Sequence, residues 1–438
     1  MLYIDCTYRH SMKRRKRRLI EKPYSGTSVW MVMSLVLGMC VPTVVHAGSE
    51  ALPAGMFPAS TLSSGSSVVG LMAPVPQAVA SLTSLSARSG IHPEVGLVLH
   101  QAQPAFEGRV EEPFTRAFLD LGLEVDGEWA LGLKNSSLYG RVAVFEGSEH
   151  VTSVGSAMGD IDFATEDDVH LERLYYEQEL LDEHLRIQIG KLAGDDEFAV
   201  SENAGPFIGG AAGLSVTMAL MPQAGDSRLG VNAFFRPNER FSLGAGVFDV
   251  SAKDERPNDP VHMDSGNVFM IAEVGTHWGT HARSLRGRLR AGAWVHNGEH
   301  QRFDGTVQAG TSGTFFVFDQ DLWHDESGGE RHVGLFARYG NADPAVMPVS
   351  HHVGAGMTLV GLFAPEAGDV FSAGGGFAWL SPETESDRPF ELAFELAYAW
   401  PFSEWGVIQP NVQYFINPSG NEEVANAVVG SLRLGMSL

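Results

Sequence analysis

Apolar and polar side chains alternate over stretches of roughly ten residues through most of this chain, a length typical of membrane-crossing strands. The clearest stretch is 390–400, in which large apolar residues occupy every second position: Phe390, Leu392, Phe394, Leu396, Tyr398 and Trp400. Glu391 and Glu395 fall on the opposite face, among small alanines. A period of two predicts a β-strand, because a helix would scatter these residues around its circumference.

The same alternation recurs along the chain in 117–125, 185–192, 228–235, 408–416 and 431–438. Aromatic residues gather near the ends of such stretches, as at Tyr398 and Trp400, where an interfacial girdle would lie. Short turns, such as one near 401–404, alternate with longer polar loops, such as 252–264 and 381–388. These features favour a membrane barrel, with its apolar face toward lipid, over a soluble sandwich.

The number of strands follows from length. About 350 residues, at roughly 22 residues for each strand and its connection, give ~16 strands, a number at which the lumen is a water-filled pore. No stretch beyond residue 47 reaches 18 consecutive apolar residues, which excludes a spanning helix there. We therefore predict an all-β protein, a transmembrane antiparallel β-barrel over residues 88–438.

The first 47 residues are typical of a secretory signal peptide. A basic region, 14–18, precedes an apolar run, 29–41, and small or modest side chains at 45–47 place cleavage near Ala47. The basic region lies far from Met1, so Met12 or a later Met is an alternative start. A single-helix anchor is the other interpretation, but a run of ~13 residues is short for a membrane span of ~20. We expect export to the outer membrane of a Gram-negative cell.

Removal of this segment changes the charge of the protein. Residues 1–47 contain eight of the 30 Lys and Arg residues and two of the 53 acids, so the remainder has 22 bases, 51 acids and a net charge of −29. Such a surface repels nucleic acid. Both cysteines, Cys6 and Cys40, lie in this segment. Residues 48–87, rich in Ala, Ser and Pro, are predicted to be a periplasmic lead or linker, with a plug or first strand as the alternative.

The polar face of the predicted strands carries unusually many arginines. Charged side chains on the lipid face near mid-membrane cost ~2–4 kcal/mol each, so we assign these residues to the lumen. The predicted pore-lining residues are Arg186, Gln188, Arg228, Arg288, Arg290, Trp294, Arg338, Glu391, Glu395, Gln409, Gln413 and Arg433. Sugars present hydroxyl edges and apolar C–H faces, which planar donors, acceptors and an aromatic ring can recognise. The alternative is that the arginines pair with lumen acids and keep the barrel rigid.

Signals for other chemistry are poor. The sequence contains no G-x-S-x-G, H-E-x-x-H or P-loop motif, and we predict no catalytic residue, no cofactor and no metal site. His351 and His352 are adjacent, so on a strand they point to opposite faces and cannot chelate one ion together. Acids concentrate in predicted loops, such as 383–387 and 422–423, where they would form an acidic mouth.

Short motifs in the same strands resemble the carbohydrate-selective porin family of the OprB type. They include Arg173-Leu174-Tyr175-Tyr176-Glu177-Gln178, Gly244-Ala245-Gly246-Val247-Phe248-Asp249, Gly292-Ala293-Trp294-Val295-His296, Asp319-Gln320-Asp321-Leu322-Trp323 and Gln409-Pro410-Asn411-Val412-Gln413-Tyr414. The resemblance covers about residues 88–438, and the order of the motifs is more specific than any one of them.

The resemblance implies a barrel of about 16 strands that passes glucose and similar sugars passively, without ATP or cofactor. The expected partners are sugar solutes, outer-membrane lipid, lipopolysaccharide and the barrel-assembly machinery, and a homo-oligomer is an open alternative to a monomer. Two features depart from the family pattern: the chain ends in Leu438 rather than an aromatic residue, and its charge is unusually acidic. The competing functions are a general porin for small polar solutes and, from another class, an outer-membrane enzyme or a lectin-like β protein.

Overall fold

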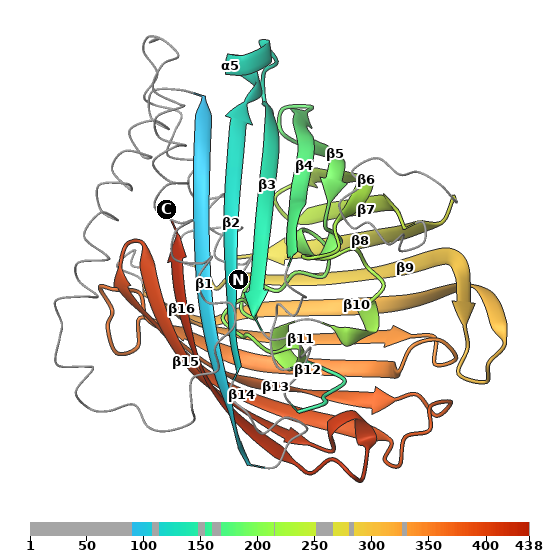
Figure 1. Ribbon diagram of the computed structural model, residues 1–438. Helices are drawn as coiled ribbons and strands as arrows, with labels where there is room; N and C mark the ends of the chain where they lie inside the picture. Colours follow the sequence, from blue (N-terminus) through green and yellow to red (C-terminus); the bar gives the residue numbers. More distant parts are fainter. Residues whose placement is uncertain are drawn as a thin grey trace.

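The strands of the protein form one closed barrel (Figure 1). A computed structural model describes residues 90–106, 114–147, 154–159, 168–213, 215–250, 266–279, 284–325 and 331–437. Within these residues, sixteen antiparallel strands follow one another around the wall in chain order. The predicted signal peptide, the lead at 48–87 and the loop at 252–264 lie outside the described residues.

The strands differ in length around the wall. Their bounds are β1 (Ile91–Phe106), β2 (Phe114–Asp126), β3 (Ser136–Gly147), β4 (Asp168–Leu180), β5 (Leu185–Leu192), β6 (Arg228–Asn238), β7 (Phe241–Asp249), β8 (Val268–Trp278), β9 (Gly287–Gln301), β10 (Val307–His324), β11 (His332–Ala342), β12 (Val349–Val360), β13 (Val370–Leu380), β14 (Phe390–Ser403), β15 (Gly406–Ile416) and β16 (Ala427–Ser437). The turn expected near 401–404 is shorter than predicted, because β14 continues to Ser403.

The barrel closes where β1 pairs with β16. Leu99 lies opposite Leu434 and His100 opposite Arg433, while the other edge of β1 pairs with β2. Closure leaves neither terminal strand with an open edge, so the backbone groups of both find partners. Both cysteines lie in the predicted signal peptide, so the barrel has no cysteine to form a disulfide. The closed sheet can stabilise it without one.

Exposure alternates along the strands as the sequence pattern predicts. On β14, Phe394 and Leu396 are about half exposed, whereas Glu391, Ala393 and Glu395 are buried. On β15, Val412 is exposed between the buried Asn411 and Gln413. Large apolar side chains therefore cover the outside of the barrel, and polar or small ones face inward, the arrangement that a membrane barrel requires.

The two ends of the barrel differ in their connections. Connections from an even to an odd strand are mostly short, such as 239–240 and 404–405, and define the turn end. Connections from an odd to an even strand define the loop end and include the long 193–227. Long loops mark the extracellular side of such barrels and short turns the periplasmic side.

Few helices interrupt the described chain. They are α5 (Gly127–Leu131), η3 (Gly194–Asp196), α6 (Gly210–Gly213), η4 (Val216–Met218) and η5 (Pro418–Gly420). None of the helices in the described residues is long and apolar enough to cross a membrane. Of these, η3, α6 and η4 belong to 193–227, here called the inner segment, which is drawn in green inside the barrel in Figure 1.

Candidate functional site

The predicted pore-lining residues all lie on the inner, less exposed face of their strands. Arg186, Arg228 and Arg290 are partly buried, and the others are buried: Gln188, Arg288, Trp294, Arg338, Glu391, Glu395, Gln409, Gln413 and Arg433. Their neighbours in sequence, such as Ile189, Leu289 and Leu432, are exposed on the outer face. Low exposure also means that most of these side chains contact protein rather than open lumen.

One wall of the lumen holds the inner segment through Arg288 of β9 and Asp319 of β10. The Arg288 guanidinium pairs with Glu202 at 3.0 Å, pairs with Asp319 at 3.2 Å and donates to the Val200 carbonyl at 2.9 Å. Asp319 in turn accepts from Ser201 Oγ at 2.6 Å and from the Asn203 backbone N–H at 3.2 Å. Residues 200–203 are thereby fixed to this wall.

Another part of the wall, separated from the first by β11, β12 and β13, holds the next part of the inner segment through β14 and β15. The Glu395 carboxylate accepts backbone N–H groups of Ile208 and Gly209 at 2.8 and 3.0 Å, and the Asn411 amide at 2.6 Å. Gln409 Nε2 donates to the Pro206 carbonyl at 2.6 Å. The inner segment therefore extends along the inside of the barrel from the β9–β10 wall to the β14–β15 wall.

Part of the lumen beside the inner segment is a packed apolar core. Trp294 is 1 % exposed and stacks on Phe269 with ring centroids 5.6 Å apart. Both belong to a cluster with Phe198, Met218 and further residues of the inner segment and wall. The expected aromatic surface for sugar is thus covered at Trp294, because the inner segment packs over it.

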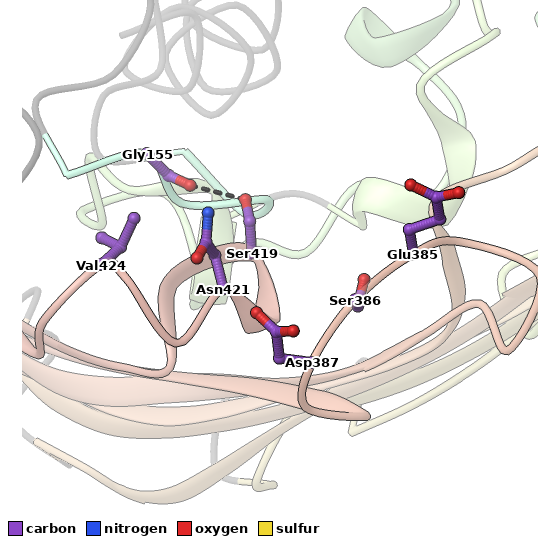
Figure 2. A pocket seen from close by; sticks show the side chains of 7 residues that line it. All are labelled: Gly155, Glu385, Ser386, Asp387, Ser419, Asn421 and Val424. Carbon is purple, nitrogen blue, oxygen red and sulfur yellow. Dashed lines mark hydrogen bonds between the residues drawn. The ribbon is translucent and has the colours of Figure 1, made fainter.

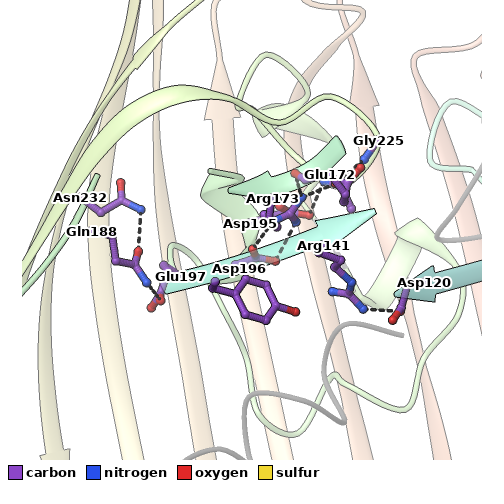
Figure 3. A network of polar contacts seen from close by, with 12 residues as sticks. Asp120, Arg141, Glu172, Arg173, Gln188, Asp195, Asp196, Glu197, Gly225 and Asn232 are labelled. Carbon is purple, nitrogen blue, oxygen red and sulfur yellow. Dashed lines mark hydrogen bonds and ion pairs between the residues drawn. The ribbon is translucent and has the colours of Figure 1, made fainter. Parts of the chain in front are cut away.

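A network of charged and amide groups joins β4, β5 and β6 to the start of the inner segment (Figure 3). Arg186 binds both carboxylate oxygens of Glu197, at 2.7 and 2.6 Å, and also Glu177 at 3.2 Å. Gln188 donates to Glu177 and Glu197 at 3.0 and 3.1 Å and accepts from Asn232. Alternating charges of this kind satisfy one another in a partly dry lumen.

The same network extends to β3 through a second arginine cluster. Arg173 of β4 contacts Glu172 and Asp196, with a distance of 2.7 Å from Nε to Asp196. Arg141 on β3 pairs with Asp120 on β2 (Figure 3). Sequence reasoning did not select these two arginines, although they obey the same inward parity.

The remaining predicted residues line other parts of the inner face. Arg290 pairs with Glu273 at 3.2 Å and donates to the Glu197 carbonyl at 3.1 Å. Arg228 pairs at 2.6 Å with Asp226, near the end of the inner segment. Arg338 lies with its guanidinium carbon 5.9 Å from the centre of the Phe336 ring.

Arg433 and Gln413 occupy the region where the barrel closes. Arg433 is level with Gln409 on β15 and with His100 on β1, and Gln413 is level with Glu395 on β14. Twelve predicted residues thus share one inner face but do not converge on a single pocket. They line a lumen that also contains the inner segment.

A second infolded stretch, 154–159, lies beside the inner segment. The Glu391 carboxylate contacts Ser156 Oγ and accepts the Ala157 N–H at 2.8 Å and the Ser419 N–H at 2.6 Å. Ser419 Oγ donates to the Gly155 carbonyl (Figure 2). Glu391 therefore holds this stretch against β14 at the loop end.

A pocket of about 230 Å³ opens at this place, lined by Gly155, Glu385, Ser386, Asp387, Ser419, Asn421 and Val424 (Figure 2). Its acids belong to the connection between β13 and β14, one of the loops predicted to form an acidic mouth. Among the residues that the structure describes, no group of three or more His, Cys, Asp or Glu side chains is arranged to hold a metal ion.

Comparison with known proteins identifies the family. Residues 124–438 match the model of the carbohydrate-selective porin, OprB family. This chain belongs to the OprB family. Its fold is similar to the high-pH structure of Pseudomonas putida OprB, with a TM-score of 0.73 and 16% identity over 81% of this chain and 96% of that one. The low-pH structure of the same protein gives a TM-score of 0.55 and 15% identity, over 82% and 96% of the two chains. A search of curated proteins found no match.

Membership of the OprB family agrees with what the geometry allows. The protein is an outer-membrane β-barrel porin, and its family and fold point to a channel. The family resemblance seen in the sequence is confirmed, and so is the barrel of sixteen strands. In this OprB porin, the inner segment lies within the lumen of the barrel.

Proposed function

We propose that this OprB porin mediates passive diffusion of carbohydrates, with glucose-like monosaccharides as the preferred solutes. The observation that carries the proposal is the inner segment, which lies inside the barrel and is held there by Arg288, Glu395 and Gln409. The inner face of the wall around it carries arginine, amide and carboxylate groups. Such groups replace the water around sugar hydroxyls, whereas an apolar solute would gain nothing from them.

Charge balance further supports a neutral solute. Several inner-face arginines are matched by carboxylates, as in the pairs Arg288–Asp319 and Arg290–Glu273. Loop acids such as Glu385 and Asp387 surround the loop end. An acidic mouth disfavours anion entry, and a balanced interior gives neither ion a strong advantage. A neutral polyhydroxylated solute meets no electrostatic barrier in either place.

The test is liposome swelling with purified, refolded or membrane-extracted protein. Glucose, arabinose and a zwitterionic amino acid of similar size are compared at equal osmolarity. Faster swelling with the two sugars than with the amino acid supports the proposal. Equal rates for all three would instead support the general porin for small polar solutes.

The proposal also includes the biogenesis of the protein. Residues 1–47 act as a signal peptide with cleavage near Ala47, and the barrel-assembly machinery inserts the chain beside lipopolysaccharide. N-terminal sequencing of the mature protein tests the cleavage site. Cross-linking in intact cells distinguishes a monomer from a homo-oligomer.

A further inference from the structure

The inner segment lies close to the wall at α6, where the Ala211 carbonyl meets β12 and β13. His352 of β12 lies 3.1 Å from this oxygen through Nε2, and its side chain is fully buried. A carbonyl oxygen only accepts, so Nε2 carries the proton and donates it. The sequence raised His352 only as a candidate metal ligand, whereas in the structure it contacts the Ala211 carbonyl.

Two glycines make room for the same carbonyl. Gly354 of β12 and Gly376 of β13 lie directly opposite each other in the sheet. A Cβ added at Gly376 would lie 2.3 Å from Ala211 O, and a Cβ at Gly354 would lie 3.0 Å from it. The first distance is shorter than any real Cβ contact, so a side chain at Gly376 must displace α6. We call Gly354, Gly376 and His352 the carbonyl seat.

Displacement of α6 has only one direction available. The closed wall of β12 and β13 lies behind it, so α6 moves toward the barrel axis. Two anchors hold the chain before α6: Thr358 Oγ1 donates to the Asn203 carbonyl at 2.7 Å, and Glu395 accepts from Gly209 at 3.0 Å. After α6, the buried Met218 packs in the apolar core of the lumen. A local inward shift therefore narrows the lumen without releasing the rest of the inner segment.

We propose that the carbonyl seat sets the cross-section of the pore. Its members are positioning residues: they act on the solute through the depth at which they hold α6, not by touching it. The inference rests on the proposed function only in taking the lumen as the solute path. It assigns size selection to three residues on the wall behind the inner segment.

The first experiment compares three glycine variants of the full-length porin in planar bilayers. Gly376→Ala is expected to reduce single-channel conductance in KCl by about twofold, since pore diameter governs conduction. Gly354→Ala is expected to give a smaller reduction, because its Cβ needs a shift of only a few tenths of an ångström. Gly430→Ala is the matched control, a strand glycine with no atom within 4 Å of the added Cβ, and should behave as wild type.

The second experiment tests the hydrogen bond. His352→Leu removes the donor, while His352→Gln retains an N–H that can reach the carbonyl. The readout is the ratio of liposome swelling rates with a disaccharide and with arabinose, which a loss of stability alone does not change. His352→Leu is expected to change this ratio, and His352→Gln to restore it toward wild type.

The outcomes separate this inference from the proposed function. Conductance that is equal in Gly376→Ala, Gly354→Ala and Gly430→Ala overturns the carbonyl seat, even if sugars remain preferred. A conductance that is lowest in Gly376→Ala, intermediate in Gly354→Ala and equal to wild type in Gly430→Ala supports the carbonyl seat, even if glucose and the amino acid pass at equal rates. If Gly376→Ala yields no folded band on an unheated gel, Gly354→Ala and the His352 pair decide, and wild-type behaviour in all of them overturns it.

Discussion

Glu391 and Glu395 lie on the same inner face of β14, yet each carboxylate holds a different infolded part of the chain. Glu391 accepts backbone N–H groups at Ala157 and Ser419, and Glu395 accepts those of Ile208 and Gly209. A carboxylate has about four lone-pair positions, so one side chain can satisfy several N–H donors. A single strand thus anchors both segments that narrow the lumen.

We predict that Glu395→Ala widens the channel more than Glu391→Ala does. Hydrogen bonds to a charged group contribute about 1.5–3 kcal/mol each, and Glu395 makes its bonds to the inner segment itself. The measurement is single-channel conductance and its current noise. Equal conductance in the two variants would contradict the separate roles of the two carboxylates.

Arg288→Ala should release residues 200–202 from the β9–β10 wall and raise conductance. The change leaves Asp319 buried without this cation, and breaking a buried pair costs about 3–5 kcal/mol. Arg286→Ala is the matched control, since the Arg286 side chain is 68% exposed and its pair with Asp321 contributes about 0–1 kcal/mol. Conductance and urea unfolding in detergent report the two effects. Identical behaviour of the variants would exclude Arg288 as an anchor.

Trp294→Phe should leave sugar flux unchanged. Trp294 is covered by the inner segment, and its indole N–H has no hydrogen-bond partner in the described structure. Trp294→Ala should instead lower the free energy of unfolding by about 3–5 kcal/mol through the cavity it creates. Swelling rates with glucose and unfolding curves measure both. A large loss of glucose flux in a stably folded Trp294→Phe would show that the ring contacts the solute.

Asp369 at the turn end gives a pH-dependent prediction. Burial alone would raise its pKa, but hydrogen bonds from the Phe363 and Ala364 backbone N–H groups, at 2.9 and 2.8 Å, hold the pKa below its usual value. A depressed pKa contributes stability above the unfolded pKa, and this contribution is lost as pH falls through the folded pKa.

Asp369→Ala should therefore lower the urea midpoint at neutral pH, with a loss of about 1–3 kcal/mol. Wild type and variant should converge in acid, where the carboxyl is protonated in both folded and unfolded wild-type chains. A stability difference that stays constant from neutral pH into the acid range would argue against the role of the carboxylate.

Local sequence determined the strands and the faces of their side chains. A strand allows only two side-chain directions, so the side chains of Phe394 and Glu395 must point to opposite faces. Because lipid surrounds the barrel, the apolar Phe394 is the one that points outward. Closure followed because unpaired backbone groups are not tolerated in lipid. For the same reason Arg186, Gln409 and Arg433 could be placed on the inner face from the sequence.

Only the tertiary structure decided what those inner side chains contact. Arg288, Glu395 and His352 each contact the inner segment, which lies far away in the chain. No periodicity in the sequence predicts which wall a loop will meet. The covering of Trp294 and the close approach of Ala211 to Gly376 arise in the same way. Strand parity is a local property of the backbone, whereas the path of a loop through a lumen depends on packing between distant residues.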